Sequence, residues 1–151
     1  MRQKLSEALK EAMRAGDKRR VSTVRLMSAA LKDKDIEARG AGKGQASDED
    51  ILGLLQKMIK QRQESADIYD KAGRGELATQ EREEIAIINT FLPAQMDEAE
   101  MRAAITSAIA ETGAKSMKEM GKVVGALKAK YAGRMDFGKA SALVKAELGQ
   151  G

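Results

Sequence analysis

Apolar residues recur every three or four positions along almost the whole chain, between short breaks marked by glycine. This spacing places them on one side of an α-helix, whereas a half-buried strand would alternate apolar and polar residues. Of the 151 residues, 25 are alanine, four are aromatic and one is proline. Alanine loses little freedom in a helix, and β-branched and aromatic residues are too sparse to build a sheet. We therefore expect an all-α fold.

Four helices are expected before Pro93 and three shorter ones after it. The glycine-rich stretch 40–44 is interpreted as a linker. These positions predict an N-terminal helical domain over residues 1–93 and a three-helix C-terminal domain over residues 94–151. Each of the first four helices is expected to bury one line of residues, which we call its stripe. The first stripe is Leu5, Leu9 and Met13, and the second is Val21, Val24, Met27 and Leu31, extended by Ile36. The third is Ile51, Leu54, Leu55, Met58, Arg62 and Ile68, and the fourth is Ile85, Ile88 and Leu92.

Helix starts are predicted where Ser, Thr or Asp precedes a helical stripe, because their side chains accept hydrogen bonds from the first free backbone N–H groups. Two of these residues are followed three positions later by glutamate, the pattern of a capping box. The predicted caps are Ser47, Thr79, Asp97, Ser116 and Asp136, of which Asp97 and Ser116 carry the glutamate.

Positive charge is concentrated in two stretches, although the net charge is only +4. Residues 1–34 hold ten bases and four acids, and residues 115–145 hold eight bases and two acids. A basic surface on a small helical unit predicts an anionic partner, with Lys and Arg contacting phosphates. With only four aromatics to stack on bases, RNA recognition would be of backbone and shape, and sensitive to salt. The candidate nucleic-acid-binding residues are Lys115, Lys118, Lys122, Lys128, Lys130, Arg134 and Lys139, with Lys145 nearby.

Two glycines, Gly121 and Gly125, lie four residues apart in the sixth predicted helix. Each costs about 1 kcal/mol relative to alanine in a helix. Such a pair indicates something packed closely against the helix backbone. A neighbouring helix is one alternative, and a sugar–phosphate backbone is the other.

Catalysis by the isolated chain is not expected. The chain has no cysteine and no histidine, which excludes a Cys–His nucleophile and most acid–base arrangements. The stretch 40–44 lacks the spacing of a phosphate-binding loop. Acid clusters at 48–50 and 81–84 fit the first turns of helices, where acids are stabilised. We therefore expect no catalytic residue, no metal and no cofactor.

The absence of cysteine, of an apolar signal core and of a run long enough to span a membrane leads us to expect a cytoplasmic protein.

A second group of charged residues falls on the apolar stripes of the N-terminal half. Charge on a core-facing stripe is costly unless it is paired. One interpretation is a partly buried ion-pair cluster that sets the register of the helices, and the other is an anion pocket between them. The residues are Arg25, Lys60, Arg62, Glu81 and Glu84.

A family resemblance rests on the order and spacing of several short segments. These are Thr23-Val24-Arg25-Leu26, Lys60-Gln61-Arg62-Gln63-Glu64-Ser65, Glu81 with Glu84-Ile85, Phe91-Leu92-Pro93-Ala94-Gln95, Met120-Gly121-Lys122-Val123-Val124 and Gly133-Arg134-Met135-Asp136. Nearly the whole chain resembles the YqeY-like proteins, and its C-terminal part is similar to the tail of the B subunit of the tRNA-dependent amidotransferase. The family usually places Met at Val124, which remains an apolar residue here.

The resemblance implies an N-terminal helical domain, a small three-helix tail and an association with tRNA, since the amidotransferase tail contacts tRNA while other parts of that enzyme do the chemistry. Three functions stay open: a noncatalytic tRNA-binding accessory, a component of a glutamine-dependent carbon–nitrogen ligase that acts only with partner subunits, and a protein–protein adaptor. The expected partners are tRNA or another structured RNA and other proteins, without a membrane.

Overall fold

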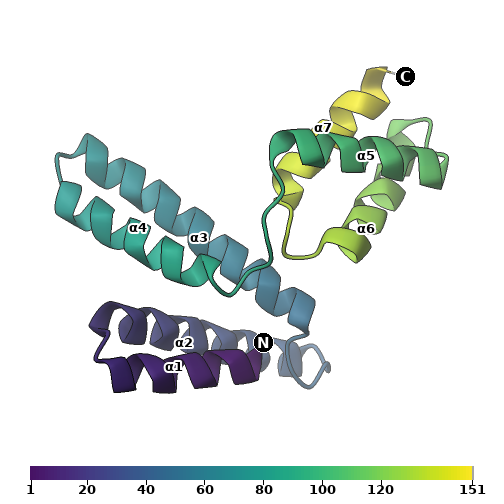
Figure 1. Cartoon of the computed structure of the whole chain (residues 1–151). Coiled ribbons are helices and arrows are strands. Elements are labelled where there is room, and N and C mark those ends of the chain that lie inside the picture. The colour runs from purple at the N-terminus through teal and green to yellow at the C-terminus, as the bar shows by residue number, and fades with distance from the viewer. Residues whose placement is uncertain (151) are drawn as a thin grey trace. The chain divides into compact units, whose positions relative to one another are not determined.

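The computed structural model describes residues 1–150, which form seven α-helices, one 3-10 turn and no strand (Figure 1). The expected all-α fold is confirmed. The chain divides into two compact units, one over Met1–Leu92 and one from Pro93 onward. Figure 1 colours the first unit from purple to teal and the second from green to yellow. That each unit is a domain able to fold alone stays a prediction.

Unit 1 contains two antiparallel helix pairs. Helices α1 (Arg2–Ala15) and α2 (Lys18–Gly40) form the first pair, and α3 (Asp48–Lys71) and α4 (Gly75–Asn89) form the second. Helix α2 also packs against α4 and α3, so the four stripes close over one core. Its largest fully buried side chains are Val24, Met27, Ile51, Leu55 and Ile88.

The start of α1 is tied to the loop between α2 and α3. Arg2 donates from Nη1 and Nη2 to the two carboxylate oxygens of Asp35, both at 2.6 Å. Arg2 Nη2 also donates to the carbonyl of Ala46 at 2.9 Å, and the Ala46 N–H donates to Asp35 at 2.9 Å. The bidentate bond to Arg2, followed by the Ala46 N–H, lowers the pKa of Asp35 from 3.8 to about 2. The stretch 40–44 is thereby anchored at its far end, and Gly40 itself belongs to α2.

Unit 2 contains α5 (Glu98–Thr112), a 3-10 turn η1 (Met117–Glu119), α6 (Met120–Tyr131) and α7 (Phe137–Gln150). The three helices surround a core that includes Ile105, Val123, Leu127, Met135 and Val144. After α6 the chain turns through Gly133, whose φ of 78° lies in the left-handed region that glycine adopts without strain.

Three of the five predicted N-caps are confirmed. Ser47 and Asp50 form a reciprocal capping box, Asp97 accepts from the Glu100 N–H at 2.7 Å, and Asp136 accepts from the N–H groups of Gly138 and Lys139.

The other two are wrong. Helix α4 begins at Gly75, so Thr79 lies inside it and its hydroxyl donates to the Gly75 carbonyl. Ser116 precedes the 3-10 turn and caps nothing through its side chain, because the chain reaches α-helical geometry only at Met120.

The expected stripes are right in their inner part and wrong at their edges. Met13, Ile36 and Ile68 are 55%, 58% and 65% exposed. Several alanines of the four helices are buried, namely Ala8, Ala12, Ala38, Ala66 and Ala78.

Candidate functional site

Arg62 and Glu84 form a partly buried ion pair between α3 and α4. Arg62 Nε donates to Glu84 Oε2 at 2.9 Å, and the two side chains are only 15% and 9% exposed. Arg62 Nη1 also donates to the Met58 carbonyl at 3.2 Å, and Gln80 donates to the other Glu84 oxygen at 3.5 Å. The charges on the two stripes therefore neutralise each other across the helix pair.

The remaining charges of this group do not converge on an anion pocket. Glu81 is half-buried, and burial, followed by the nearby charge of Glu84, raises its pKa. Arg25 and Lys60 are exposed, and within residues 1–150 their side chains make no ion pair with Glu81 or Glu84. Arg62 is the one predicted cation of this group that lies in the helix interface, where its partner is a carboxylate of the chain itself.

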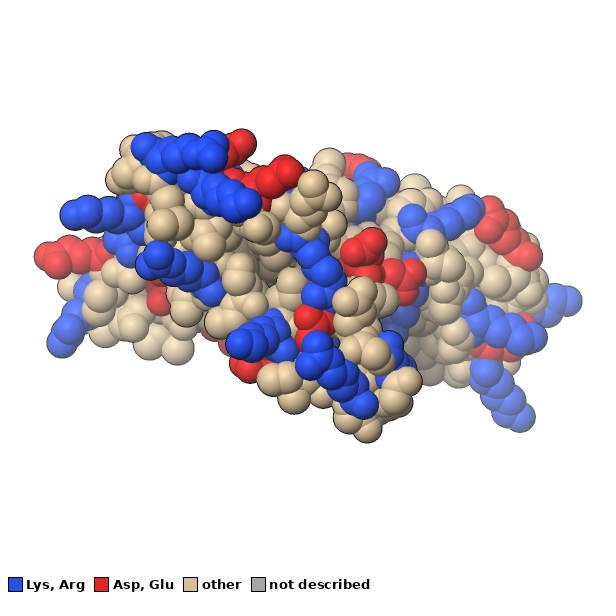
Figure 2. Space-filling view, turned by 90° about the horizontal axis from the view of Figure 1, so that it is seen from below, with Lys and Arg blue, Asp and Glu red and all other residues tan. Residues whose placement is uncertain are grey.

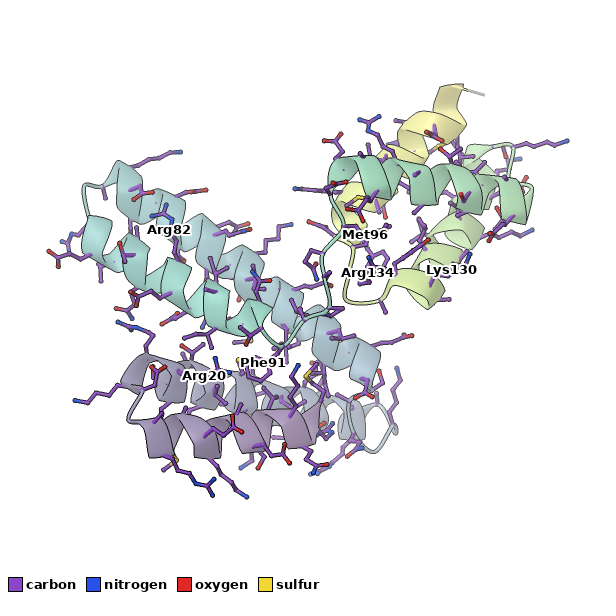
Figure 3. All side chains as sticks on the ribbon, in the orientation of Figure 1. Arg20, Arg82, Phe91, Met96, Lys130 and Arg134 are labelled. Carbon is purple, nitrogen blue, oxygen red and sulfur yellow. The ribbon has the colours of Figure 1, made fainter. Side chains whose placement is uncertain are left out.

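Among the described residues, only one of the cations between residues 115 and 145 of unit 2 forms an ion pair with a carboxylate. Lys130 Nζ lies 3.2 Å from Glu111 on α5. Arg134 Nε donates to the Ala94 carbonyl at 3.0 Å, and its guanidinium lies 6.0 Å from the centre of the Tyr131 ring. Figure 3 shows Arg134 in the segment between α6 and α7. The other cations, all exposed, are Lys115, Lys118, Lys122, Lys128, Lys139 and Lys145.

The cations do not share one side of unit 2. On α6, helical periodicity places Lys128 and Lys130 on opposite flanks of the buried residues Val123 and Leu127. This agrees with their contacts, since Lys128 lies 5.9 Å from the Phe137 ring of α7 whereas Lys130 reaches Glu111 of α5. Lys139 and Lys145 likewise fall on different sides of α7.

A smaller surface remains on the solvent side of α6, which we call the glycine–lysine face: Gly121, Lys122, Gly125 and Lys128. All four residues are exposed. A Cβ atom added at Gly121 or Gly125 would meet nothing within 4 Å. No helix of unit 2 therefore packs on these glycines, so the packing of unit 2 does not account for them.

None of the four aromatic side chains is fully exposed. Phe91 is buried, and Tyr69, Tyr131 and Phe137 are half-buried. Sequence reasoning missed the cations around Phe91, where Lys4 Nζ and the Arg20 guanidinium lie 5.5 and 5.7 Å from the ring centre. Figure 3 shows Arg20 beside Phe91. Contacts between residues so far apart in the chain leave no local signal.

On the face drawn in Figure 2, blue Lys and Arg side chains stand among red Asp and Glu side chains rather than in one continuous area. Within residues 1–150, no cluster of three or more acidic side chains has the geometry to hold a metal ion. None of the described helices combines the length and apolar character that a bilayer crossing requires.

The fold and these surfaces define an all-α protein built from a four-helix unit and a three-helix unit. The chain belongs to the Yqey-like protein family, whose profile matches residues 2–148. Among curated proteins it is similar to the "Altered inheritance of mitochondria protein 41, mitochondrial" of two yeasts. Identity is 34% over 88 residues with the protein of Vanderwaltozyma polyspora, and 33% over 90 residues with that of Eremothecium gossypii. These matches cover 58% and 60% of this chain, and 46% and 48% of the relatives, so the chain matches about half the length of each.

Proposed function

We propose that this protein is a noncatalytic RNA-associated module that binds the sugar–phosphate backbone of structured RNA, and that its RNA ligand is tRNA. The binding surface in this proposal is the glycine–lysine face of α6. The observation that carries it is a pair of helical glycines, Gly121 and Gly125, in open space between two exposed lysines, Lys122 and Lys128.

The physical chemistry of a nucleic-acid backbone fits such a face. Glycine removes the Cβ that would hold a ligand away, so a sugar–phosphate chain can approach the helix closely. Lysine supplies a mobile point charge suited to phosphate. Without an exposed aromatic ring to stack on bases, the proposed contact recognises backbone and shape. Its affinity should therefore fall steeply with salt.

The family resemblance supports tRNA as the ligand class, because the similar tail of the amidotransferase B subunit contacts tRNA. A role inside a glutamine-dependent carbon–nitrogen ligase would require the reaction to occur on partner subunits. No contact described above favours that second role. We further propose a cytoplasmic location, which cell fractionation tests; the names of the yeast relatives assign those proteins to mitochondria.

The proposal is tested by titrating tRNA into the purified chain at about 50 and 200 mM salt. We expect the double variant Lys122→Ala/Lys128→Ala to weaken binding about tenfold at low salt and to reduce the salt slope by about two. The matched control is Lys10→Ala/Lys71→Ala, which removes two exposed lysines of unit 1 that have no ion-pair partner among residues 1–150. No binding at low salt, or equal losses in both variants, would refute the proposal.

A further inference from the structure

Helix α2 carries a second line of residues on the side away from its core. Its core residues include Val24, Met27 and Leu31. On the opposite side every residue of the following set, which we call the outer row, is exposed: Ser22, Leu26, Ala29, Asp33 and Ile36. Leu26 and Ile36 are 48% and 58% exposed, so two large apolar side chains lie in solvent on one helix face. Scattered apolar residues are ordinary on a surface. Here the outer row alternates by four and three residues, and its apolar members, Leu26, Ala29 and Ile36, lie three and seven residues apart along it.

A row of four cations runs beside the outer row. Lys18, Arg25, Lys32 and Arg39 follow one another at intervals of seven residues, over about 31 Å of helix, and all are exposed. We call them the basic row. Within residues 1–150 the side chains of Lys18, Arg25 and Lys32 make no ion pair or hydrogen bond, and Arg39 donates only to the Gly44 carbonyl at 3.3 Å. The charges of Lys18, Arg25 and Lys32 are therefore free to meet a partner, whereas the charge of Arg39 also helps to lower the pKa of Asp35.

The spacing of the two rows indicates the shape of that partner. Apolar positions that alternate by four and three form the a and d seam of a coiled coil, and residues seven apart beside that seam occupy the g positions. A seven-residue repeat drifts round a straight helix in the left-handed sense, which is the path that a second helix follows when it packs along the first. A long helix therefore matches the outer row better than a flat surface does. It also matches better than a phosphate chain, which offers no apolar surface on which Leu26 and Ile36 could be buried.

Charge decides which helix can bind. In an antiparallel pair of two copies, g positions face g positions, so the basic rows would repel each other. In a parallel pair they would face the e positions Thr23, Ala30 and Glu37. Thr23 is buried and Glu37 is already 3.6 Å from Lys34. A second copy is therefore a poor match, whereas a helix with acidic flanks would pair with the basic row along its whole length.

We propose that the outer row and the basic row of α2 together form a docking site for an acidic amphipathic α-helix of another protein. Asp33 is the charged residue of the seam, where a polar side chain fixes the register of two helices at some cost in affinity. The partner helix therefore carries a cationic or amide side chain opposite Asp33. The site lies in unit 1 and uses none of the residues assigned to RNA, so the two proposals stand or fall separately.

The test uses the full chain and a synthetic 21-residue helical peptide. The peptide has leucine at a and d, lysine at the one seam position facing Asp33, and glutamate at e and g, whose mutual repulsion keeps it monomeric. We expect saturable binding by fluorescence anisotropy, and a Kd raised at least about tenfold by Arg25→Glu/Lys32→Glu, since two attractions become two repulsions. Leu26→Ser/Ile36→Ser should weaken binding similarly, whereas the control Lys10→Glu/Lys71→Glu should leave the Kd within about twofold.

Four results would overturn the proposal. They are the absence of saturable binding, an equal affinity for the same peptide with lysine at e and g, an unchanged Kd in both α2 variants, and a loss in the control as large as in the α2 variants. The wild type and the same variants also test whether a membrane or a second copy of the chain, rather than a partner helix, covers the outer row. Binding to phosphatidylserine vesicles, or self-association in sedimentation, that disappears in Leu26→Ser/Ile36→Ser would assign the row to that other occupant.

Discussion

Arg62 Nε on α3 lies 2.9 Å from Glu84 Oε2 on α4, and both side chains are largely withdrawn from water. An ion pair in this position fixes the register of two helices, because breaking it leaves one charge buried without a partner. The pair shows how the sequence accommodates two charges on stripes that are otherwise apolar.

Removing one member of the pair should destabilise unit 1. We expect Arg62→Ala to lower the free energy of unfolding by about 2–3 kcal/mol, measured by urea unfolding, since it strands Glu84. Arg62→Met/Glu84→Leu, which replaces both charges with apolar side chains, should recover most of that loss. If Arg62→Ala were as stable as the wild type and had lost the binding of an anion, the pair would be a ligand site instead.

Acid should weaken the anchor between α1 and the α2–α3 loop. The pKa of Asp35 is about 2 in the folded state against 3.8 ordinarily, so the unfolded chain binds more protons between these values. The contribution of the ionised Asp35 side chain to stability is therefore complete above about pH 5 and declines progressively toward pH 2. We expect Asp35→Asn and Arg2→Met each to flatten the pH dependence of urea unfolding in that window. A variant whose stability still fell as steeply as the wild type would contradict this account.

The two serines predicted as caps should respond differently to alanine. Ser47→Ala should cost about 1 kcal/mol, because the Asp50 N–H loses its acceptor. Ser116→Ala should change stability by less than about 0.5 kcal/mol, since its side chain caps nothing. Thermal unfolding of the two variants side by side measures the difference, and equal losses would mean that Ser116 has a role that the fold does not explain.

Replacing the glycines of α6 with alanine should raise the stability of the protein and weaken its binding to tRNA. Gly121→Ala and Gly125→Ala should each raise the free energy of unfolding by about 0.5–1 kcal/mol, because the added methyl group meets open space. Gly53→Ala is the matched control, since Gly53 is also helical, exposed and open. All three variants should be more stable, but only the α6 pair should bind tRNA more weakly. Unchanged tRNA affinity in Gly121→Ala/Gly125→Ala would exclude close approach of RNA to this face.

The sequence predicted the helices and three of their starts because these depend on neighbouring residues. The capping box of Ser47 and the caps Asp97 and Asp136 are examples. The start of α4 was not predictable in this way. Thr79 has the pattern of a cap, but Gly73 takes the left-handed conformation with a φ of 73°, and the helix starts at Gly75.

Burial and pairing depend on contacts that the sequence does not display. Periodicity marks a helix face but does not say that Ala12 packs closely while Met13 remains in solvent. The pairing of Arg2 with Asp35 spans 33 residues, and nothing local singles out that partner. The stretch 115–145 is rich in cations, and helical periodicity within α6 and α7 already separates its lysines onto different sides, but the contacts of Lys128 with Phe137 and of Lys130 with Glu111 appear only in the fold.

Amide chemical shifts of glycine-labelled protein, followed during a tRNA titration, report whether RNA approaches the glycine–lysine face. We expect the Gly121 and Gly125 signals to shift or broaden first, while that of Gly53 stays in place. Changes confined to Gly53 and the other glycines of unit 1, or no change at a tRNA concentration that saturates binding, would contradict such an approach.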